Sequence, residues 1–389
     1  MKKLFIIFML AITGFSVNAQ WQQTSFNSTY VYDLTIGGDS IWACTYGKGV
    51  YVSENNGSTW SAMNTGLSSI DIYSLVIINN HILAGTEGSG MFLSTNNGSS
   101  WATANTGLTN MDVWSLTIGN GNVFAGTSNG VFLSSDFGGS WTKVSTGLPA
   151  NTQINALDWN GSDIFAGTYA HGVLMSSNNG TSWDTVNTGL NYTNGINALV
   201  ISGSNMFAGT SQGVYLSTNN GTSWSAVNTG LPVNTIVSSF AISGDTILAG
   251  TKNGGVYMSL NNGGSWKETN WGLANPNVLA LAISGNNIYA GTSTGVWKTS
   301  LTGLGINEIN NEACISVFPN PAINTITINT GDLKSTVNDL RIYDIVGNLM
   351  CEKSFNNKTD IDVSDYHGGV YVLEVRTQKG SEVKKFVKE

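Results

Sequence analysis

Short runs of alternating apolar and polar residues follow one another along residues 21–300, separated by clusters of Gly, Asn and Ser. Runs such as 72–77, 81–86, 213–217 and 224–227 have the length and period of half-buried β-strands. Because the separating residues favour tight turns, we expect an antiparallel, all-β arrangement over this part of the chain.

These runs recur in a fixed order with a period of about 41 residues. The tripeptide Ala-Gly-Thr ends at Thr86, Thr127, Thr168, Thr210, Thr251 and Thr292, and Ala-Cys-Thr takes its place at Thr45. The spacings are 41, 41, 41, 42, 41 and 41 residues. Four short strands per period of about 40 residues are typical of one propeller blade, so the seven units predict a seven-bladed β-propeller.

The ends of the repeat predict how the ring closes. Trp21 stands where the fourth strand of a unit begins, whereas the last unit, 278–300, has three strand-like runs and no fourth. The N-terminal segment is therefore expected to complete the last blade, which would remove an exposed sheet edge.

Changes of composition at both ends suggest the domain boundaries. Residues 1–19 have the features of a signal peptide, since Lys2 and Lys3 precede an apolar run and Val17-Asn18-Ala19 suits a signal peptidase. We expect the propeller over 20–304, a linker over 305–315 and a small Ig-like β-sandwich over 316–389, where strand-like alternation resumes. The mature chain offers no stretch that predicts a membrane span.

Six units share the sequence Ser-x-Asn/Asp-x-Gly-x-Ser/Thr-Trp, for example Ser53 to Trp60 and Ser134 to Trp141. This box resembles the Asp-box, or BNR repeat, of sialidases, sortilin-type receptors and photosystem assembly propellers, although Asn replaces Asp in five boxes. An Asn or Asp can cap its own turn, Gly can adopt positive φ, and Trp can fill the space between blades. We therefore expect the box to be structural.

The tail contains four motifs in order: Val317-Phe318-Pro319-Asn320-Pro321-Ala322, the runs 340–347 and 369–375, and Lys384-Lys385-Phe386-Val387-Lys388. With these, residues 316–389 resemble the C-terminal sorting domain of type IX secretion substrates in Bacteroidota. The resemblance implies that the tail binds the type IX secretion machinery and that the protein is secreted or displayed at the cell surface.

Charge and composition exclude several kinds of partner and site. The net charge is −8 with only 16 Lys and Arg, so we expect no nucleic-acid partner. His81, His171 and His367 lack ligand spacing, and we expect no metal and no cofactor. Cys314 and Cys351 could form a disulfide or remain free thiols.

The sequence excludes one enzyme activity and leaves another open. A sialidase needs an arginine cluster for its substrate's carboxylate, but both arginines, Arg341 and Arg376, lie in the tail, which excludes that activity. Asp71 and Asp112 precede the first strands of adjacent blades and are candidates for the carboxylate pair of a glycoside hydrolase. The alternative is that they are ordinary loop acids.

Candidate ligand-binding residues are those at which the units differ on one loop face. The second position of the first strand and the loop between the second and third strands supply Tyr32, Tyr46, Tyr73, Trp114, Asn155, Tyr169, His171 and Asn197. Exposed aromatics beside amides suit sugar faces or protein surfaces, whereas packing between blades is the alternative. We hypothesise an exported, non-catalytic propeller that binds a glycan or protein. A glycoside hydrolase acting on polysaccharide and a structural or assembly propeller remain alternatives.

Overall fold

The computed structural model describes residues 21–27, 29–191, 195–301, 316–329, 338–344, 348–356, 358–377 and 380–389. The chain divides into two compact units, 1–304 and 305–389, which are described separately below. The predicted signal peptide and the whole predicted linker, with Cys314 in it, lie outside the described residues. The part of the chain with assigned structure contains no helix long and apolar enough to cross a membrane.

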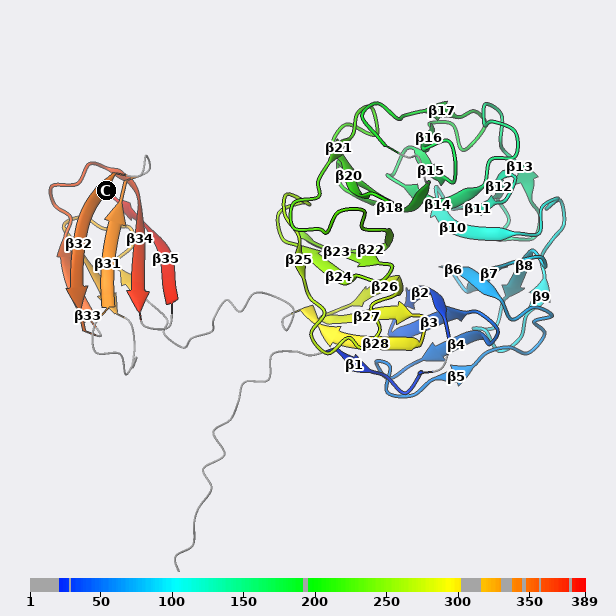
Figure 1. Cartoon of the computed structure of the whole chain (residues 1–389), viewed down its shortest axis with the longest axis horizontal. Coiled ribbons are helices and arrows are strands. Elements are labelled where there is room, and N and C mark those ends of the chain that lie inside the picture. The colour runs from blue at the N-terminus through cyan, green and yellow to red at the C-terminus, as the bar shows by residue number, and fades with distance from the viewer. Residues whose placement is uncertain are drawn as a thin grey trace, which may run out of the picture. The chain divides into compact units, whose positions relative to one another are not determined.

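The described residues of the first unit form seven four-stranded antiparallel sheets arranged as a ring, which confirms the predicted fold (Figure 1). Blades 1 to 3 are β2 (Val31–Gly37), β3 (Ser40–Thr45), β4 (Gly49–Ser53), β5 (Ser61–Ala62); β6 (Ile72–Ile78), β7 (His81–Thr86), β8 (Met91–Ser94), β9 (Ala102–Thr103); and β10 (Val113–Gly119), β11 (Asn122–Thr127), β12 (Gly130–Ser134), β13 (Thr142–Lys143). Blades 4 to 6 are β14 (Ile154–Trp159), β15 (Ile164–Thr168), β16 (Val173–Ser176), β17 (Asp184–Thr185); β18 (Ile196–Ser202), β19 (Asn205–Thr210), β20 (Gly213–Ser217), β21 (Ser225–Ala226); and β22 (Val237–Ser243), β23 (Thr246–Thr251), β24 (Gly255–Ser259), β25 (Lys267–Glu268). The first strand of each blade lies toward the ring centre and the short fourth strand at the rim.

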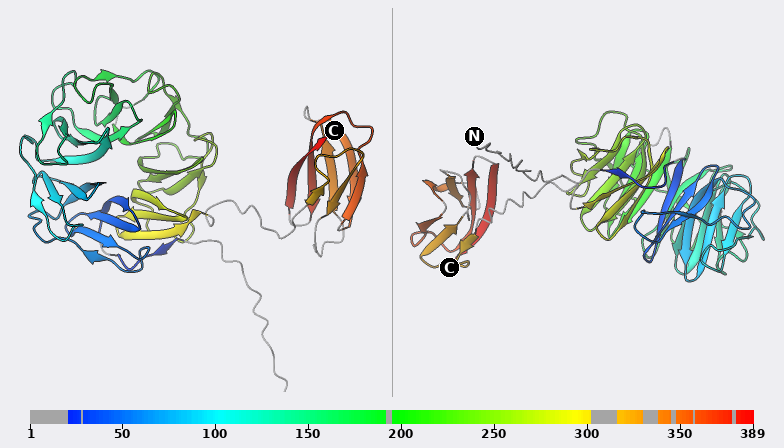
Figure 2. Two further views of the ribbon diagram at one scale, coloured as in Figure 1. Left: turned by 180° about the vertical axis from the view of Figure 1, so that it is seen from behind. Right: turned by 90° about the horizontal axis from the view of Figure 1, so that it is seen from below.

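The two ends of the propeller meet in blade 7, as the sequence predicted. Its strands are β26 (Val278–Ser284), β27 (Asn287–Thr292), β28 (Gly295–Ser300) and the N-terminal β1 (Gln22–Gln23). Gln22 pairs with Lys298 and Gln23 with Trp297, so the first described strand covers the edge of the last hairpin. Figure 2 shows β1 beside the strands of this blade from two further directions.

Each box closes its turn through the hydrogen bonds that its residue types predict. In the third blade, Ser134 Oγ donates to Asp136 Oδ1 at 2.8 Å and accepts from the Gly138 N–H at 2.7 Å. Asp136 Oδ1 also accepts from the Ser140 N–H at 2.9 Å. The five Asn boxes repeat these contacts with an amide oxygen, and Asn also donates to the following Ser or Thr hydroxyl. The box is therefore a self-contained turn.

The tryptophan that follows each box joins neighbouring blades. Trp141 is 4% exposed, and its Nε1–H donates across the blade boundary to the Ala104 carbonyl at 2.8 Å. The same bond is made from Trp101 to Met63, Trp183 to Val144, Trp224 to Val186, Trp266 to Val227 and Trp21 to Thr269. Trp60, beside the blade that closes the ring, is the exception in the described chain, because its buried Nε1 has no hydrogen-bond partner.

The sequence Asn-Thr-Gly-Leu recurs after the fourth strands, as in Asn105 to Leu108, and contacts these tryptophans. The Trp141 N–H donates to the Thr106 carbonyl at 2.8 Å. A Cβ on Gly107 would lie 2.1 Å from the Trp141 carbonyl oxygen, and Gly107 has a φ of +79°. Only glycine meets both demands, which explains why the string recurs.

Two carboxylates join the inner strands of neighbouring blades. Asp33 Oδ2 accepts from the Leu75 N–H at 2.9 Å, from blade 1 to blade 2. Asp158 Oδ2 accepts from the Ile201 N–H at 2.8 Å, from blade 4 to blade 5. Burial raises the pKa of both carboxyl groups, that of Asp158 to about 6, and their bonds to backbone N–H groups oppose the increase.

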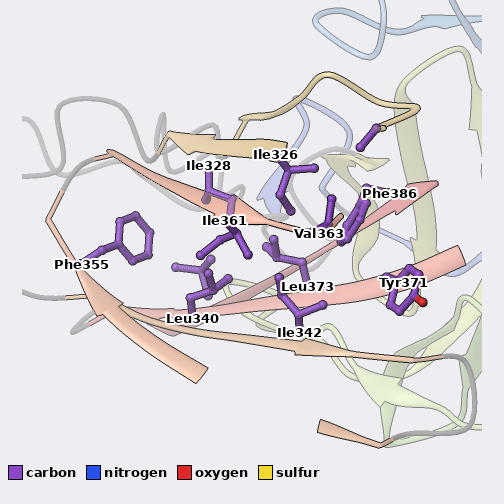
Figure 3. Packing of buried hydrophobic residues seen from close by; sticks show 12 residues of the cluster. Ile326, Ile328, Leu340, Ile342, Phe355, Ile361, Val363, Tyr371, Leu373 and Phe386 are labelled. Atoms are coloured by element: carbon purple, nitrogen blue, oxygen red, sulfur yellow. The ribbon is translucent and has the colours of Figure 1, made fainter. Parts of the chain in front are cut away.

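The second unit is a two-sheet sandwich, as predicted. One sheet contains β29 (Ser316–Phe318), β30 (Thr325–Asn329) and β33 (Lys358–Asp362), and the other has the order β32 (Leu349–Phe355), β31 (Asn338–Tyr343), β34 (Gly369–Thr377), β35 (Gly380–Lys388). Ile326 and Ile328 face Leu340 and Leu373 across a buried core (Figure 3). Cys351 is a free thiol.

Replacing Trp141 with Phe should lower the free energy of unfolding by about 1–3 kcal/mol, because the Ala104 carbonyl loses its buried donor. Trp60→Phe is the matched control and should be close to neutral, since it removes a donor that has no partner. Denaturant unfolding of the two variants, followed by circular dichroism, measures the difference. Equal losses in both would contradict the assigned role of the indole bond.

The raised pKa of Asp158 predicts a pH-dependent stability. The pKa of Asp in an unfolded chain is about 3.9, so the folded protein binds the Asp158 proton more tightly than the unfolded chain does. Proton binding at Asp158 therefore adds to the free energy of unfolding at about pH 4 and below, and this contribution is lost as the pH rises through 6. Between pH 4 and pH 7 the free energy of unfolding of the wild type should fall by about 1–2 kcal/mol relative to that of Asp158→Asn, a figure that allows for solvent screening of a partly buried group. Tryptophan fluorescence during unfolding reports on the propeller, because every tryptophan lies within 21–297. The exposed Asp184→Asn control should track the wild type at each pH.

Candidate functional site

Two kinds of candidate position share one face of the propeller. Each first strand begins opposite the end of the second strand, as in the pairing of Val31 with Thr45 and of Val113 with Thr127. Residues at the start of a first strand therefore lie beside the loop between the second and third strands. This loop face is the one on which we expected a ligand.

On this face five aromatic side chains of blades 1 to 3 form one continuous cluster, which we call the aromatic patch: Tyr30, Tyr32, Tyr46, Tyr73 and Trp114. The Tyr32 and Tyr73 rings stack with centroids 4.5 Å apart and planes inclined by 12°. Trp114 meets Tyr73 edge-on at 4.7 Å, and Tyr46 meets Tyr32 edge-on at 6.1 Å. Tyr30, which the sequence did not single out, lies 6.3 Å from Tyr32.

Polar contacts fix the orientation of these rings. Tyr73 Oη donates to Glu87 Oε2 at 3.0 Å, and Trp114 Nε1 donates to Ser128 Oγ at 2.8 Å. Burial raises the pKa of the Tyr32 and Tyr73 phenols, and hydrogen bonding to Glu87 raises that of Tyr73 further. Both phenols therefore remain protonated donors at neutral pH.

The patch remains open to solvent at its margin. Tyr30 and Tyr46 are 46% and 48% exposed. Ile70 and Met111 are also exposed, and their carbonyls accept from Gly49 and Gly90 in the loops beside the patch. Sequence reasoning missed these two residues, because an isolated Ile or Met in a connecting loop carries no signal of its surroundings.

Asp71 and Asp112 hold loops of the preceding blade. Asp71 Oδ1 accepts from the Gly47 N–H at 2.7 Å, and Asp112 Oδ1 accepts from the Gly88 N–H at 2.9 Å. Asp112 Oδ2 also accepts from Ser128 Oγ at 3.2 Å. Each carboxylate thus holds one of the loops that border the aromatic patch.

The amide candidates of blades 4 and 5 are likewise engaged in contacts between blades. Asn155 Nδ2 donates to the Ile196 carbonyl at 3.0 Å, and Asn197 Nδ2 donates to the Val237 carbonyl at 3.3 Å. Ser238 makes the equivalent bond to Val278. These side chains therefore bond to the backbone of the next blade.

Tyr169 and His171 belong to the corresponding loop of blade 4. The Tyr169 side chain is 61% exposed, while the His171 backbone bonds to Thr168 and Asn187. The structure gives neither side chain a ring contact with the patch among the described residues. The described residues also contain no group of three His, Cys, Asp or Glu side chains that could hold a metal ion.

Two family models match parts of the chain. Residues 316–389 match the secretion system C-terminal sorting domain, and residues 108–245 match the DUF6242 β-propeller domain. No curated protein matches the chain.

Solved propellers resemble the structure at low sequence identity, which shows the fold alone. PorZ, a surface component of the type IX secretion system of Porphyromonas gingivalis, is 18% identical with a TM-score of 0.56, over 93% of this chain and 59% of that one. The extracellular domain of BT4673 from B. thetaiotaomicron is 18% identical with a TM-score of 0.62, over 80% and 46%. YCF48 bound to a D1 peptide is 15% identical with a TM-score of 0.60, over 73% and 96%.

The chain spans about half the length of the first two of these proteins. The model of the sorting domain nevertheless matches the tail over all of residues 316–389. The chain is thus a β-propeller that carries a type IX secretion C-terminal sorting domain, and this domain directs it to the cell surface or the medium.

Proposed function

We propose that this protein is an exported, non-catalytic binding propeller whose glycan or protein ligand docks on the aromatic patch of blades 1 to 3. The observation that carries the proposal is the patch itself, five aromatic side chains from three blades held in contact at one face. Clustered Tyr and Trp side chains supply large contact areas at low entropic cost, and they are enriched in binding sites.

The surrounding polar groups favour binding over catalysis. Asp71 and Asp112 are engaged with backbone N–H groups of the adjoining loops. These bonds give each carboxylate a role in holding a loop beside the patch, which accounts for both residues without a catalytic step. The Tyr73 phenol is held by Glu87, which favours a rigid recognition surface.

The solved relatives lend limited support. YCF48 is seen bound to a peptide, so a propeller of this fold can serve as a peptide receptor. PorZ is a surface component of the secretion system itself, which makes a binding role outside the cell reasonable for a propeller with a sorting tail.

Replacing Tyr73 or Trp114 with Ala should weaken ligand binding about 5- to 30-fold, because each removes a ring from the centre of the patch. The measurement is binding of the purified chain to arrayed glycans and to arrayed extracellular proteins, followed by titration of each hit. Trp271→Ala is the matched control, since Trp271 is 57% exposed and lies outside the patch. Hits bound equally by all variants, or hydrolysis of any arrayed polysaccharide that is lost in Asp71→Ala, would contradict the proposal.

Deleting Lys384 to Glu389 should block export and leave the protein in the periplasm. The deletion removes Phe386 from the sandwich core and the Val387 N–H that donates to Asn320 Oδ1 at 2.9 Å. Fractionation of cells into periplasm, outer membrane and medium measures the outcome. The exposed Lys358→Ala variant, which leaves the C-terminal strand intact, is the control and should be exported normally; export of the truncated chain would refute the prediction.

A further inference from the structure

One backbone carbonyl on the loop face receives a side-chain amide in six blades. It belongs to the residue before the glycine that leads into the third strand. The bonds run from Asn64 to Lys48, Asn105 to Ser89, Asn187 to His171, Asn228 to Gln212, Asn270 to Gly254 and, in the closing blade, Gln23 to Thr294. Donor–acceptor distances range from 2.7 to 3.4 Å.

The amide fills its position tightly. In the first blade, Asn64 Oδ1 also accepts from the Val50 N–H at 2.8 Å, so that one side chain bridges the turn. A Cβ on Gly49 would lie 2.3 Å from Asn64 Oδ1. There is consequently no space for a ligand group at this position in blade 1.

Blade 3 departs from this pattern, because Ser145 replaces the asparagine. Ser145 Oγ accepts from the Val131 N–H at 3.1 Å and donates to the Val131 carbonyl at 3.2 Å. The serine thus reproduces the bond to the third strand but is too short to reach the Asn129 carbonyl. Among the seven carbonyls at this position in the described residues, that of Asn129 alone receives no side-chain amide donor.

A pocket of about 360 Å³ lies at this position, lined by Asn129, Lys143, Ser145, Thr146, Leu148 and Pro149, among others. Asn129 directly follows Ser128, whose hydroxyl accepts from Trp114 Nε1 of the aromatic patch. The lining residues of the pocket thus include Asn129, the lysine Lys143 and the apolar residues Leu148 and Pro149.

We propose that this pocket binds the acetamido group of an N-acetylated hexose residue, an inference that rests on the proposed function and deepens it. The amide N–H of the sugar would donate to the Asn129 carbonyl, as asparagine does in five other blades. Lys143 would donate to the amide oxygen, and Leu148 with Pro149 would contact the methyl group. The volume lies in the range of small-ligand pockets, about 300–1,000 Å³, which favours a sugar ring over a lone Asn side chain from a protein.

The test compares chitotriose with cellotriose, which differ by the acetamido groups, in calorimetric titrations of the full purified chain. We expect chitotriose to bind at least about tenfold more tightly, the effect of one good hydrogen bond with its contacts. Ser145→Asn restores the side chain of five other blades and should abolish this preference while leaving the thermal midpoint unchanged or raised. Ser225→Asn, at an exposed fourth-strand position, is the matched control and should bind like the wild type.

Lys143→Ala provides a second variant that does not depend on filling the pocket, and it should weaken chitotriose binding severalfold. Equal or absent binding of the two sugars by the wild type, chitotriose binding retained in Ser145→Asn, or capture of an Asn-bearing peptide instead of chitotriose would overturn the inference. The proposed function fails separately, because it depends on Tyr73 and Trp114. A ligand lost in those variants but insensitive to Ser145→Asn would refute the pocket alone.

Discussion

Packing of a tryptophan between neighbouring blades, with an indole hydrogen bond at six of the seven boundaries, is the contact on which the propeller depends. A four-stranded blade exposes two faces and cannot bury both by itself, so each blade needs its neighbours. The buried Trp141 side chain packs between two blades, and its indole N–H bonds to Ala104, just after the fourth strand of the preceding blade. The glycine of each Asn-Thr-Gly-Leu string allows this close approach. The same contact therefore recurs from blade to blade around the ring.

Many polar side chains of the propeller are bonded within the scaffold itself. Polar groups that recur, such as the box Asn residues, are satisfied within their own turns. Several polar side chains that do not recur also form hydrogen bonds between neighbouring blades, namely those of Asp33, Asp158, Asn155 and Asn197. The aromatic ring contacts on the loop face are concentrated in blades 1 to 3.

The fold could be predicted from the sequence because a 41-residue period leaves little freedom, and closure followed from the position of Trp21. The clustering of Tyr32, Tyr73 and Trp114 was also predictable, since equivalent positions of adjacent blades must lie side by side. The roles of Asn155 and Asp71 were not, because each bonds to backbone of another blade and depends on register. The effect of Ser145 was hidden for the same reason: a Ser in place of Asn is unremarkable until the carbonyl that it fails to reach is located.

Closure by the N-terminal strand has a consequence for the order of folding. Gln23 bonds to Thr294, 271 positions further along the chain, so the last blade cannot be completed until almost the whole propeller has been synthesised. Contacts of such long range form late and slowly. Until β1 pairs with β28, the last blade therefore has an unpaired strand edge, and only that late pairing gives the ring its closed, edge-free form.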